Sequence, residues 1–253
     1  MRKSSTNVGI LNLFEKIIRS HPLIYIFCRS LIRYSNIFEK DFDGLKLLNF
    51  KKKINIIDVG ASDGISAKFF NNNLNVNKII CFEPYKKYYE ILKSSHNLKN
   101  LIVKPYAIGN KSEIKKIFYP RYILFRKKFD IITYTHYDKN LLNHHMNDFI
   151  FKQNLEIVSD KIKLKKIKSF NLKIDLIKID TNGYEFNIIK GLIDVIKKDR
   201  PVLIIEINKD KRKIIKLLNK FNYQFFYYSS KQNKFVKKFQ AHTSNLFFLQ
   251  KIK

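Results

Sequence analysis

The chain has 253 residues, 45% of them hydrophobic, which is enough for one α/β domain with extensions around a sizeable core. Its formal net charge of +29 points to an anionic partner such as nucleic acid or lipid headgroups, although a bias toward Lys, Ile and Asn explains part of the excess. Arg29 and Arg33 interrupt the apolar stretch 22–38, which excludes a membrane-spanning helix there, and neither cysteine has metal-ligand spacing around it.

Residues 8–40 are expected to form one or two amphipathic helices with a break at His21-Pro22. Such an apolar face either packs on the parent domain or lies on a membrane surface, where the neighbouring arginines suit anionic lipid. We assign residues 1–50 to an N-terminal helical extension and residues 51–253 to the main domain. Because no signal-peptide pattern is seen, we expect a cytoplasmic protein, with a peripheral position on the inner face of the membrane as an extension of that expectation.

After the basic run 51–53 the chain alternates between short apolar runs and segments with helical periodicity. The runs are rich in Ile and Val without polar alternation, which is typical of strands buried on both faces. The predicted strands are Ile54–Val59, Lys78–Phe82, Leu101–Val103, Leu176–Ile179 and Val202–Ile207, and the helices between them are Ile65–Asn73, Tyr85–His96 and Tyr184–Lys198. Repeated strand–helix–strand order predicts a mostly parallel, doubly wound, Rossmann-like sheet.

Residues 111–172 interrupt this alternation of predicted strands and helices. The segment 154–168 is predicted to form two short strands around Ser159-Asp160, and 122–151, rich in Tyr, Phe and His, is interpreted as an insertion over the sheet edge that recognises an acceptor. Beyond it we expect a basic helix over Lys211–Phe221, and then a closing antiparallel pair of strands at Tyr223–Tyr228 and Asn245–Leu249.

A carboxylate ends each of four predicted strands in a chain that has few acids. The four are Asp58, Glu83, Asp180 and Glu206. Ligands of open α/β sheets bind outside the carboxyl ends of the strands, and a buried strand has no structural reason to end in a carboxylate, whose desolvation is costly. The pattern therefore predicts one shared site at this rim of the sheet.

The turn after the first strand indicates which chemical class of ligand binds at this rim. Its spacing, Gly60 to Gly64, is not the G-x-G-x-x-G that cradles a dinucleotide pyrophosphate, and Asp63 would repel a phosphate but receive an ammonium group. Glu83, at the second strand end, is placed to accept both hydroxyls of a ribose. An adenosyl ligand with an amino-acid tail and no phosphate meets these demands.

At this point the sequence resembles the FkbM-type S-adenosylmethionine-dependent methyltransferases, from about Asn55 to Ile207. The resemblance rests on four blocks: 57–61 with Gly64; 82–84, which reads Phe-Glu-Pro; 107–109, which reads Ala-Ile-Gly; and 174–180 with 183 and 185. The last block continues into Lys190-Gly191-Leu192, Arg200-Pro201 and Glu206.

The resemblance implies a class I methyltransferase sheet with a closing antiparallel strand, and methylation of hydroxyls, often on sugars. We therefore expect S-adenosyl-L-methionine as cofactor and a sugar of a glycan, glycolipid or nucleotide sugar as acceptor. The predicted cofactor-binding residues are Asp58, Gly60, Ala61, Ser62, Asp63, Gly64, Glu83, Pro84, Ala107 and Asp180. One departure matters: Asn182 stands where the family usually has an acid, which puts activity in doubt if that acid positions the acceptor.

Methyl transfer to a hydroxyl needs a positioned oxygen and a group that takes its proton. We rank Asp180 first as that group, followed by Glu206 and His242. Glu185 either belongs to the site or stabilises the N-terminus of the helix that it opens. His144-His145 lacks ligand spacing for a metal, and no metal site is predicted.

Two other functions remain open at the level of sequence. The charge suggests a nucleic-acid methyltransferase, but residues 180–183 read Asp-Thr-Asn-Gly and not the Pro-Pro-aromatic run that holds an extruded base; ribose methylation is not excluded by this test. Asn182 also allows a catalytically inactive basic binding protein of the same fold. Beyond the sugar acceptor, we expect contact with an anionic membrane through residues 8–40 as a further partner.

Overall fold

The computed structural model describes residues 21–35, 38–95, 98, 100–147, 154–239 and 243–251. The chain forms two compact units, one made of residues 37–115 with 162–253 and the other of 116–161 with the residues up to 36. Each is described by itself.

The larger unit is built on one sheet with the strand order β11-β10-β12-β9-β8-β1-β2-β3. From β9 to β3 neighbouring strands are parallel, whereas β12 is antiparallel to both β9 and β10. The strands are β1 (Ile54–Val59), β2 (Val76–Phe82), β3 (Leu101–Lys104), β8 (Leu176–Ile179), β9 (Val202–Glu206), β10 (Tyr223–Ser229), β11 (Lys234–Val236) and β12 (Asn245–Gln250). The predicted doubly wound, Rossmann-like sheet with a closing antiparallel strand is confirmed.

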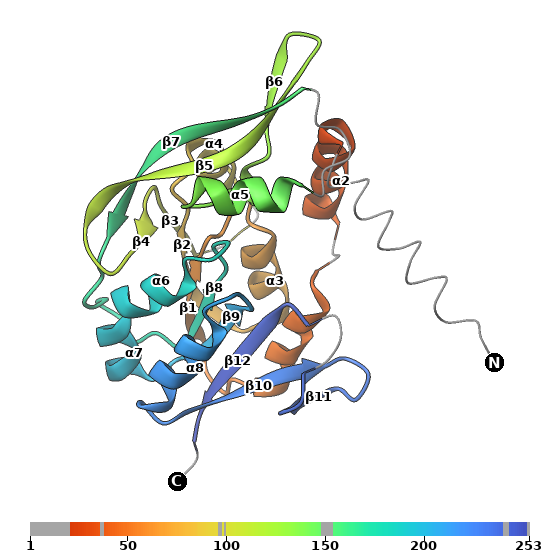
Figure 1. Cartoon of the computed structure of the whole chain (residues 1–253). Coiled ribbons are helices and arrows are strands. Elements are labelled where there is room, and N and C mark those ends of the chain that lie inside the picture. Colours follow the sequence, from red (N-terminus) through yellow and green to blue (C-terminus); the bar gives the residue numbers. More distant parts are fainter. Residues whose placement is uncertain are drawn as a thin grey trace, which may run out of the picture. The chain divides into compact units, whose positions relative to one another are not determined.

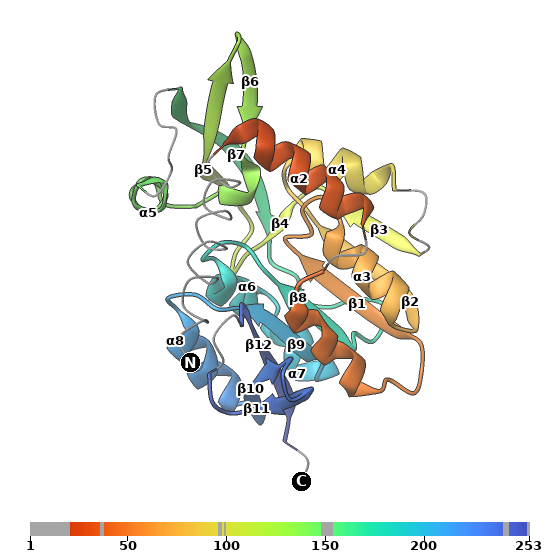
Figure 2. The same ribbon diagram turned by 90° about the vertical axis from the view of Figure 1, so that its right-hand side faces the viewer.

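Helices cover both faces of this sheet (Figures 1 and 2). The α-helix α3 and the 3-10 helix η1 lie on one face, and α6, α7 and α8 lie on the other. The bounds are η1 (Lys40–Leu48), α3 (Ile65–Asn73), α4 (Lys86–Lys93), α6 (Glu185–Gly191), α7 (Ile193–Asp199) and α8 (Lys211–Asn219). Helices on both faces are what strands without polar alternation require.

The single helix predicted over 184–198 is wrong, because the chain breaks between Gly191 and Ile193 into α6 and α7. The backbone of Gly191 packs so closely on residue 109 that a Cβ there would lie 2.2 Å from the Gly109 carbonyl oxygen. The helix therefore ends at a glycine that a tertiary contact requires, a cause that helical periodicity does not reveal.

The core on the α3 side follows the two-residue alternation of the strands. Ile54 and Ile56 of β1, Ile79 and Cys81 of β2, Leu176 of β8 and Ile204 of β9 all belong to one buried cluster with Phe42, Leu45, Phe69 and Phe70. Phe42 and Leu45 come from η1, and the two other phenylalanines come from α3. Every second residue of these strands thus faces α3 and η1.

The smaller unit holds α2, β6, η2, α5 and most of two long strands, β5 and β7, whose ends continue into the larger unit. The four-stranded sheet has the order β4-β7-β5-β6, with β4 paired to the far end of β7 in the larger unit. The bounds are α2 (Pro22–Tyr34), β4 (Ala107–Ile108), β5 (Glu113–Leu124), β6 (Lys127–Asp130), η2 (Ile132–Tyr134), α5 (Lys139–Met146) and β7 (Leu155–Lys165).

Two expectations for these segments are corrected or refined. The pair of short strands predicted around Ser159-Asp160 is wrong, because both residues are exposed within the single strand β7, where polar side chains are tolerated. The predicted break at His21-Pro22 is the start of α2, with Pro22 at its first position, where a missing N–H costs nothing. Residues 8–20 lie outside the described residues. None of the described helices is long and apolar enough to cross a membrane.

Candidate active site

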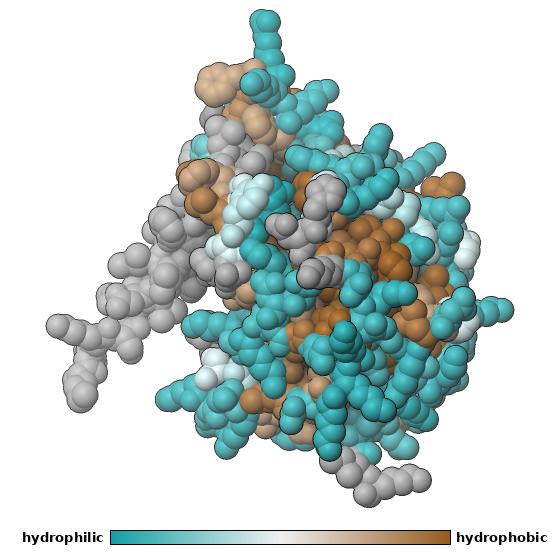
Figure 3. All heavy atoms as spheres, turned by 180° about the vertical axis from the view of Figure 1, so that it is seen from behind, coloured by the Kyte–Doolittle hydropathy of each residue, from teal (hydrophilic) through white to brown (hydrophobic). Residues whose placement is uncertain are grey.

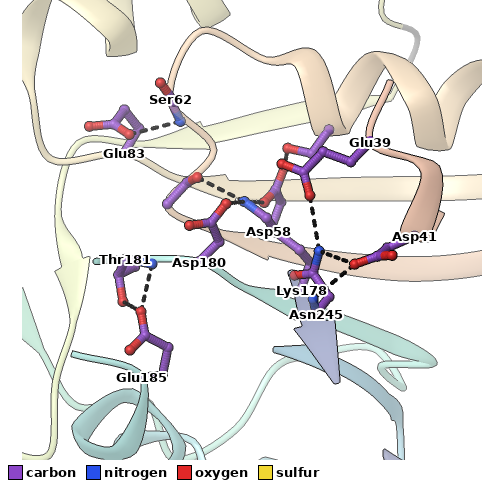
Figure 4. Close-up of polar contacts among 12 residues, drawn as sticks. Glu39, Asp41, Asp58, Ser62, Glu83, Lys178, Asp180, Thr181, Glu185 and Asn245 are labelled. Atoms are coloured by element: carbon purple, nitrogen blue, oxygen red, sulfur yellow. Dashed lines mark hydrogen bonds and ion pairs between the residues drawn. The ribbon is translucent and has the colours of Figure 1, made fainter. Parts of the chain in front are cut away.

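The four carboxylates at the strand ends lie on one face and at one edge of the large sheet. Asp58 continues the alternation Ile54, Ile56 of β1, and Glu83, Asp180 and Glu206 continue the same alternation on β2, β8 and β9. Because the four strands are parallel and adjacent, their carboxyl ends meet at one edge. The structure therefore brings together the residues that the sequence placed at one rim, and Figure 4 labels three of them, Asp58, Glu83 and Asp180.

A buried lysine that the sequence analysis did not single out lies at the centre of this rim. Lys178 of β8 is the register partner of Asp58, and its Nζ lies 3.3 Å from Asp58 Oδ1 and 3.4 Å from Asp180 Oδ2. The ammonium also donates a hydrogen bond of 3.0 Å to the Gly60 carbonyl oxygen. Burial alone lowers the pKa of Lys178, but the carboxylates of Asp58, Asp180 and Glu39 outweigh it and raise that pKa above its ordinary value.

Asp58 is fully buried and has two partners. Its Oδ2 accepts a hydrogen bond of 2.5 Å from Ser66 Oγ in the first turn of α3, and its Oδ1 forms the ion pair with Lys178. A buried carboxylate without such partners would be strongly destabilising. Asp58 thus joins β1, β8 and α3 directly beneath the first turn.

The first turn bends through three residues with left-handed φ, namely Gly60 at 75°, Ser62 at 50° and Gly64 at 89°. Glu83 holds this turn from the next strand, because its Oε2 accepts the Ser62 N–H at 2.9 Å and its Oε1 accepts the Tyr85 N–H at 2.8 Å. Burial raises the pKa of Glu83 to about 7, against the lowering effect of these two hydrogen bonds.

Gly60 is required by packing as well as by its φ. A Cβ at this position would lie 2.0 Å from the Asp180 carbonyl oxygen, so the turn after β1 and the end of β8 touch through their backbones. At Gly64 the nearest atom to such a Cβ would be Leu92 Cδ2, at 2.8 Å. Both glycines belong to the predicted cofactor-binding residues, and packing against protein atoms also requires them.

Asp180 and Glu206 form a carboxyl pair at the ends of β8 and β9. They follow directly after the last register pair of these strands, Ile179 with Ile205. Burial, the charges of Asp180 and Glu185, and a hydrogen bond with Asp180 raise the pKa of Glu206 to about 9. The raised pKa favours the protonated form of Glu206, and its buried Oε2 makes no hydrogen bond among the described residues. The Asp180 side chain is 36% exposed, so this member of the pair faces outward.

Glu185 holds the turn that follows β8. Its Oε1 accepts hydrogen bonds from Thr181 N, Thr181 Oγ1 and Gly183 N at 2.9, 3.0 and 3.1 Å, and its Oε2 accepts one from Asn208. Asn182, at the centre of that turn, has a left-handed φ of 53°, a conformation that Asn tolerates better than most residues. Glu185 therefore braces the turn that carries Asn182 and is fully buried beneath it.

Two acids from η1 and the residue before it also reach this region and were missed from the sequence. Asp41 Oδ2 accepts the Ser244 and Asn245 N–H groups at 2.7 and 2.9 Å, and Glu39 Oε2 accepts from Asn245 Nδ2 at 3.0 Å. Burial raises the pKa of both carboxyls, and the charge of Asp180 adds to this effect at Glu39. Their only sequence signal was a group of three acids, completed by Asp43, in a chain that has few acids.

The remaining predicted residues are placed as follows. Ala61 and Asp63 are buried in the first turn, Pro84 follows Glu83, and Ala107 is buried at the start of β4. His242 lies outside the described residues. Within the part of the chain that is described, no three His, Cys, Asp or Glu side chains are grouped to hold a metal ion.

The arrangement has a definite chemical bias. Oxygen acceptors on carboxylates surround the first turn and the end of β8, and the cation Lys178 lies among them, buried against Asp58. Such a rim accepts hydrogen bonds from hydroxyl and ammonium groups and repels phosphate.

The comparisons with known proteins identify the family of the chain. The family profile described as "Methyltransferase FkbM domain" matches residues 58–225, about two thirds of the chain. No curated protein matches the chain.

Solved structures with a similar fold include a methyltransferase FkbM from Methylobacillus flagellatus KT, 14% identical with a TM-score of 0.46 over 78% of this chain and 43% of that one. A SAM-dependent O-methyltransferase from Thermotoga maritima is 11% identical, with a TM-score of 0.44 over 86% of this chain and 67% of that one. The chain thus spans less than half the length of the Methylobacillus protein.

Proposed function

The chain belongs to the FkbM methyltransferase family, and from this premise we propose that it transfers the methyl group of S-adenosyl-L-methionine to a hydroxyl of a sugar in a glycan, glycolipid or nucleotide sugar. The observation that carries the proposal is the rim of four strand-end carboxylates beside a first turn without a phosphate cradle. Its chemistry suits a donor with two ribose hydroxyls and an ammonium group.

The residues of the first turn fit this donor. Each Glu83 oxygen accepts one backbone N–H, which leaves an acceptor position on each oxygen for the two ribose hydroxyls. Asp63, in the same turn, is assigned to the ammonium group, and Gly60, Ala61, Ser62, Gly64, Pro84 and Ala107 complete the proposed donor site. Lys178 holds Asp58 in place beneath the turn through their ion pair.

The cofactor supplies an electrophilic methyl group on a sulfonium, so this chain has to position an acceptor oxygen and take its proton. Asp180 is the partly exposed member of the carboxyl pair, and we assign proton acceptance to it. Glu206 is the buried, protonated member and orients Asp180 through the hydrogen bond between them. His242 stays a candidate from sequence alone.

Asn182 does not by itself remove this chemistry. The turn that carries it is held by Glu185 through three hydrogen bonds, and the proposed proton acceptor, Asp180, precedes it on β8. An intact carboxyl pair favours an active enzyme over an inactive binding protein of the same fold.

A membrane-held acceptor fits the N-terminal helix. The described part of α2 exposes Ile24, Phe27, Leu31 and Tyr34 at helical spacing, with exposed fractions of 38, 64, 54 and 77%. We extend the proposal to peripheral contact with an anionic membrane through residues 8–40, in the cytoplasm. Nucleic acid is the second candidate partner, favoured only by the net charge of +29.

Donor binding is tested by calorimetric titration of S-adenosyl-L-methionine into wild type and Glu83→Gln. Loss of the charged acceptor should weaken the affinity by about tenfold to a hundredfold. Glu90→Gln, an exposed glutamate on the neighbouring helix α4, is the matched control and should bind normally. Equal affinities for wild type and Glu83→Gln would show that Glu83 does not bind the ribose hydroxyls.

The proton acceptor is tested with Asp180→Asn, which should spare donor affinity and lower turnover by about a hundredfold or more. Asp175→Asn is the control, because Asp175 lies just before the same strand, at the opposite end, where its Oδ2 accepts the Asn55 N–H at 3.0 Å. Full turnover by Asp180→Asn would show that Asp180 is not the base.

The acceptor class is tested by incubating the protein with methyl-labelled donor and separated glycan, lipid-linked glycan and nucleic-acid fractions of a cell extract. We expect the label in a glycan fraction. Label in RNA, with binding that weakens steeply with salt, would instead support ribose methylation.

A further inference from the structure

The tip of the β5–β6 hairpin exposes an aromatic side chain to an unusual degree. Leu124 and Lys127 are the last register pair, so Phe125 and Arg126 form the two-residue turn. Phe125 is 92% exposed, the largest value among the large hydrophobic residues of the described chain, and Ile123 beside it is 39% exposed. These residues lie in the segment 122–151 that the sequence analysis interpreted as recognising an acceptor, but the proposed donor site and carboxyl pair do not include them.

The backbone conformation of the turn disfavours a bulky residue such as Phe125. Both turn residues have left-handed φ, 49° at Phe125 and 62° at Arg126. Two-residue hairpin turns with this geometry favour Asn-Gly or Asp-Gly, since a bulky side chain is strained in this region. An exposed phenylalanine at a strained position has no folding advantage over Asn or Gly, so its side chain points to a role outside the fold.

The charged residues next to Phe125 in the sequence of the hairpin tip are all cations. Arg126, Lys127 and Lys128 are exposed, and no acidic residue occurs between Glu113 and Asp130. Asp130 forms a bidentate ion pair with Arg121, its register partner. The distances are 2.5 Å from Arg121 Nε to Asp130 Oδ1 and 3.0 Å from Arg121 Nη2 to Asp130 Oδ2. In Figure 3 the projecting end of this hairpin, at the top, shows hydrophobic spheres directly beside hydrophilic ones.

The base of the hairpin is built to hold such a tip in place. Tyr119 and Tyr122 of β5 are buried, Ile131 after β6 is fully buried, and the Ile123 N–H donates to the Asn154 carbonyl oxygen at 2.9 Å. With the Arg121–Asp130 pair, these contacts make a stiff ribbon that ends in an apolar ring and three cations.

We propose that this hairpin tip inserts into the headgroup region of an anionic lipid bilayer, with Phe125 and Ile123 entering the acyl boundary and Arg126, Lys127 and Lys128 binding lipid phosphates. An exposed aromatic ring beside arginine and lysine is the composition of interfacial membrane contacts. A second copy of this chain is disfavoured as the occupant, because both copies would carry a net charge of +29. This surface is separate from residues 8–40 and was not predicted from the sequence.

The chain contains no tryptophan, so Phe125→Trp creates a single fluorescent reporter at the tip. We expect its emission to shift to shorter wavelength on addition of phosphatidylcholine vesicles containing about one third phosphatidylglycerol, and not with pure phosphatidylcholine. Ile114→Trp, at the other end of β5 where Ile114 is 73% exposed, is the matched reporter and should not shift. No shift at residue 125, or an equal shift at both residues, overturns the proposal.

Vesicle sedimentation gives the second readout. Phe125→Asn should reduce the vesicle partition coefficient by about tenfold, the factor expected when one phenyl ring is withheld from an apolar phase. Asn suits a left-handed φ, so this variant should unfold no more easily than wild type, and loss of binding will not reflect loss of folding. Binding unchanged from wild type overturns the proposal.

The charge contribution is tested with two triple variants that change the net charge equally. Arg126→Glu with Lys127→Glu and Lys128→Glu should abolish binding to the anionic vesicles, whereas the same change at the exposed residues Lys51, Lys52 and Lys53 should leave most of it. Equal losses of vesicle binding by the two variants would show a general effect of net charge and overturn the proposal that the hairpin tip binds specifically. Stronger binding of the tip reporter to a single-stranded RNA oligonucleotide than to vesicles would also overturn it.

Discussion

Lys178 is the residue on which the charge balance of the rim depends. It is 3% exposed. It forms ion pairs with Asp58 and Asp180 and donates a hydrogen bond to the Gly60 carbonyl oxygen. Removing one partner of a buried ion pair leaves a desolvated charge behind, which costs more than the pair itself contributes. Asp58 would be that charge here.

Lys178→Met should therefore lower the free energy of unfolding by about 3–5 kcal/mol, measured by urea denaturation. Lys173→Met removes a lysine whose side chain is 71% exposed, just before the same strand, and should change stability by less than about 0.5 kcal/mol. Similar effects of the two substitutions would mean that the buried ion pair is not a major stabilising contact.

Glu206 gives the rim a characteristic dependence on pH. Its pKa rises from 4.5 to about 9 on folding, so the folded protein binds a proton there that the unfolded chain releases. This contribution to stability is fully present below pH 4.5 and is lost as the pH rises through about 9. Glu83, with a pKa of about 7, adds the same trend over a narrower range.

Glu206→Gln keeps a neutral side chain of the same shape and removes the titration. Between pH 4.5 and about 9 the free energy of unfolding should fall less steeply for this variant than for wild type. Urea denaturation at a series of pH values checks the difference. Parallel curves for the two proteins would place the pKa of Glu206 near its ordinary value.

At the scale of elements, the contact between the first turn and the end of β8 is made by backbone atoms. Gly60 and Gly183 both have left-handed φ, 75° and 100°, but only Gly60 has a close neighbour, whereas a Cβ at Gly183 meets nothing within 4 Å. The two positions separate the effect of backbone conformation from the effect of packing.

Gly183→Ala should cost about 1–2 kcal/mol, the strain of a left-handed alanine. Gly60→Ala should cost about 2 kcal/mol more, because its Cβ must displace the end of β8 as well. Thermal or urea unfolding of both variants measures the difference. Equal costs would mean that the two strand ends separate easily.

Most elements of the larger unit could be predicted from the sequence because local pattern and tertiary burial agree there. The runs Ile54–Val59 and Leu176–Ile179 and the helix Ile65–Asn73 match β1, β8 and α3 residue for residue. Errors arose where a tertiary contact or strained backbone decided the outcome, as at Gly191 and at the Phe125-Arg126 turn, which lacks the usual turn residues.

The candidate site was predictable in the same uneven way. The ends of the apolar runs indicate where the strands end, so the carboxylates at those positions, Asp58, Glu83, Asp180 and Glu206, could be identified from the sequence. Lys178 was not, since a lysine inside an apolar run carries no sign of which buried carboxylate it faces. Glu39 and Asp41 were missed because their partner, Asn245, is about two hundred residues away in the chain.

For the whole molecule, the net charge of +29 means that like charges repel one another across the folded surface. Raising NaCl from about 0.05 M to about 0.5 M shortens the range of this repulsion and should increase Tm by about 2–4 °C. Scanning calorimetry at several salt concentrations checks this. A Tm that falls with salt would show that attractive surface ion pairs outweigh the repulsion.

The contact between Asp41 and the start of β12 has a consequence for synthesis of the protein. Asp41 receives its two backbone partners from Ser244 and Asn245, and the η1 residue Phe42 shares its cluster with Phe247. A ribosome delivers these partners only after about two hundred further residues, so the nascent chain carries η1 without them during that interval. We expect the emerging polypeptide to depend on chaperones until β12 has left the ribosome.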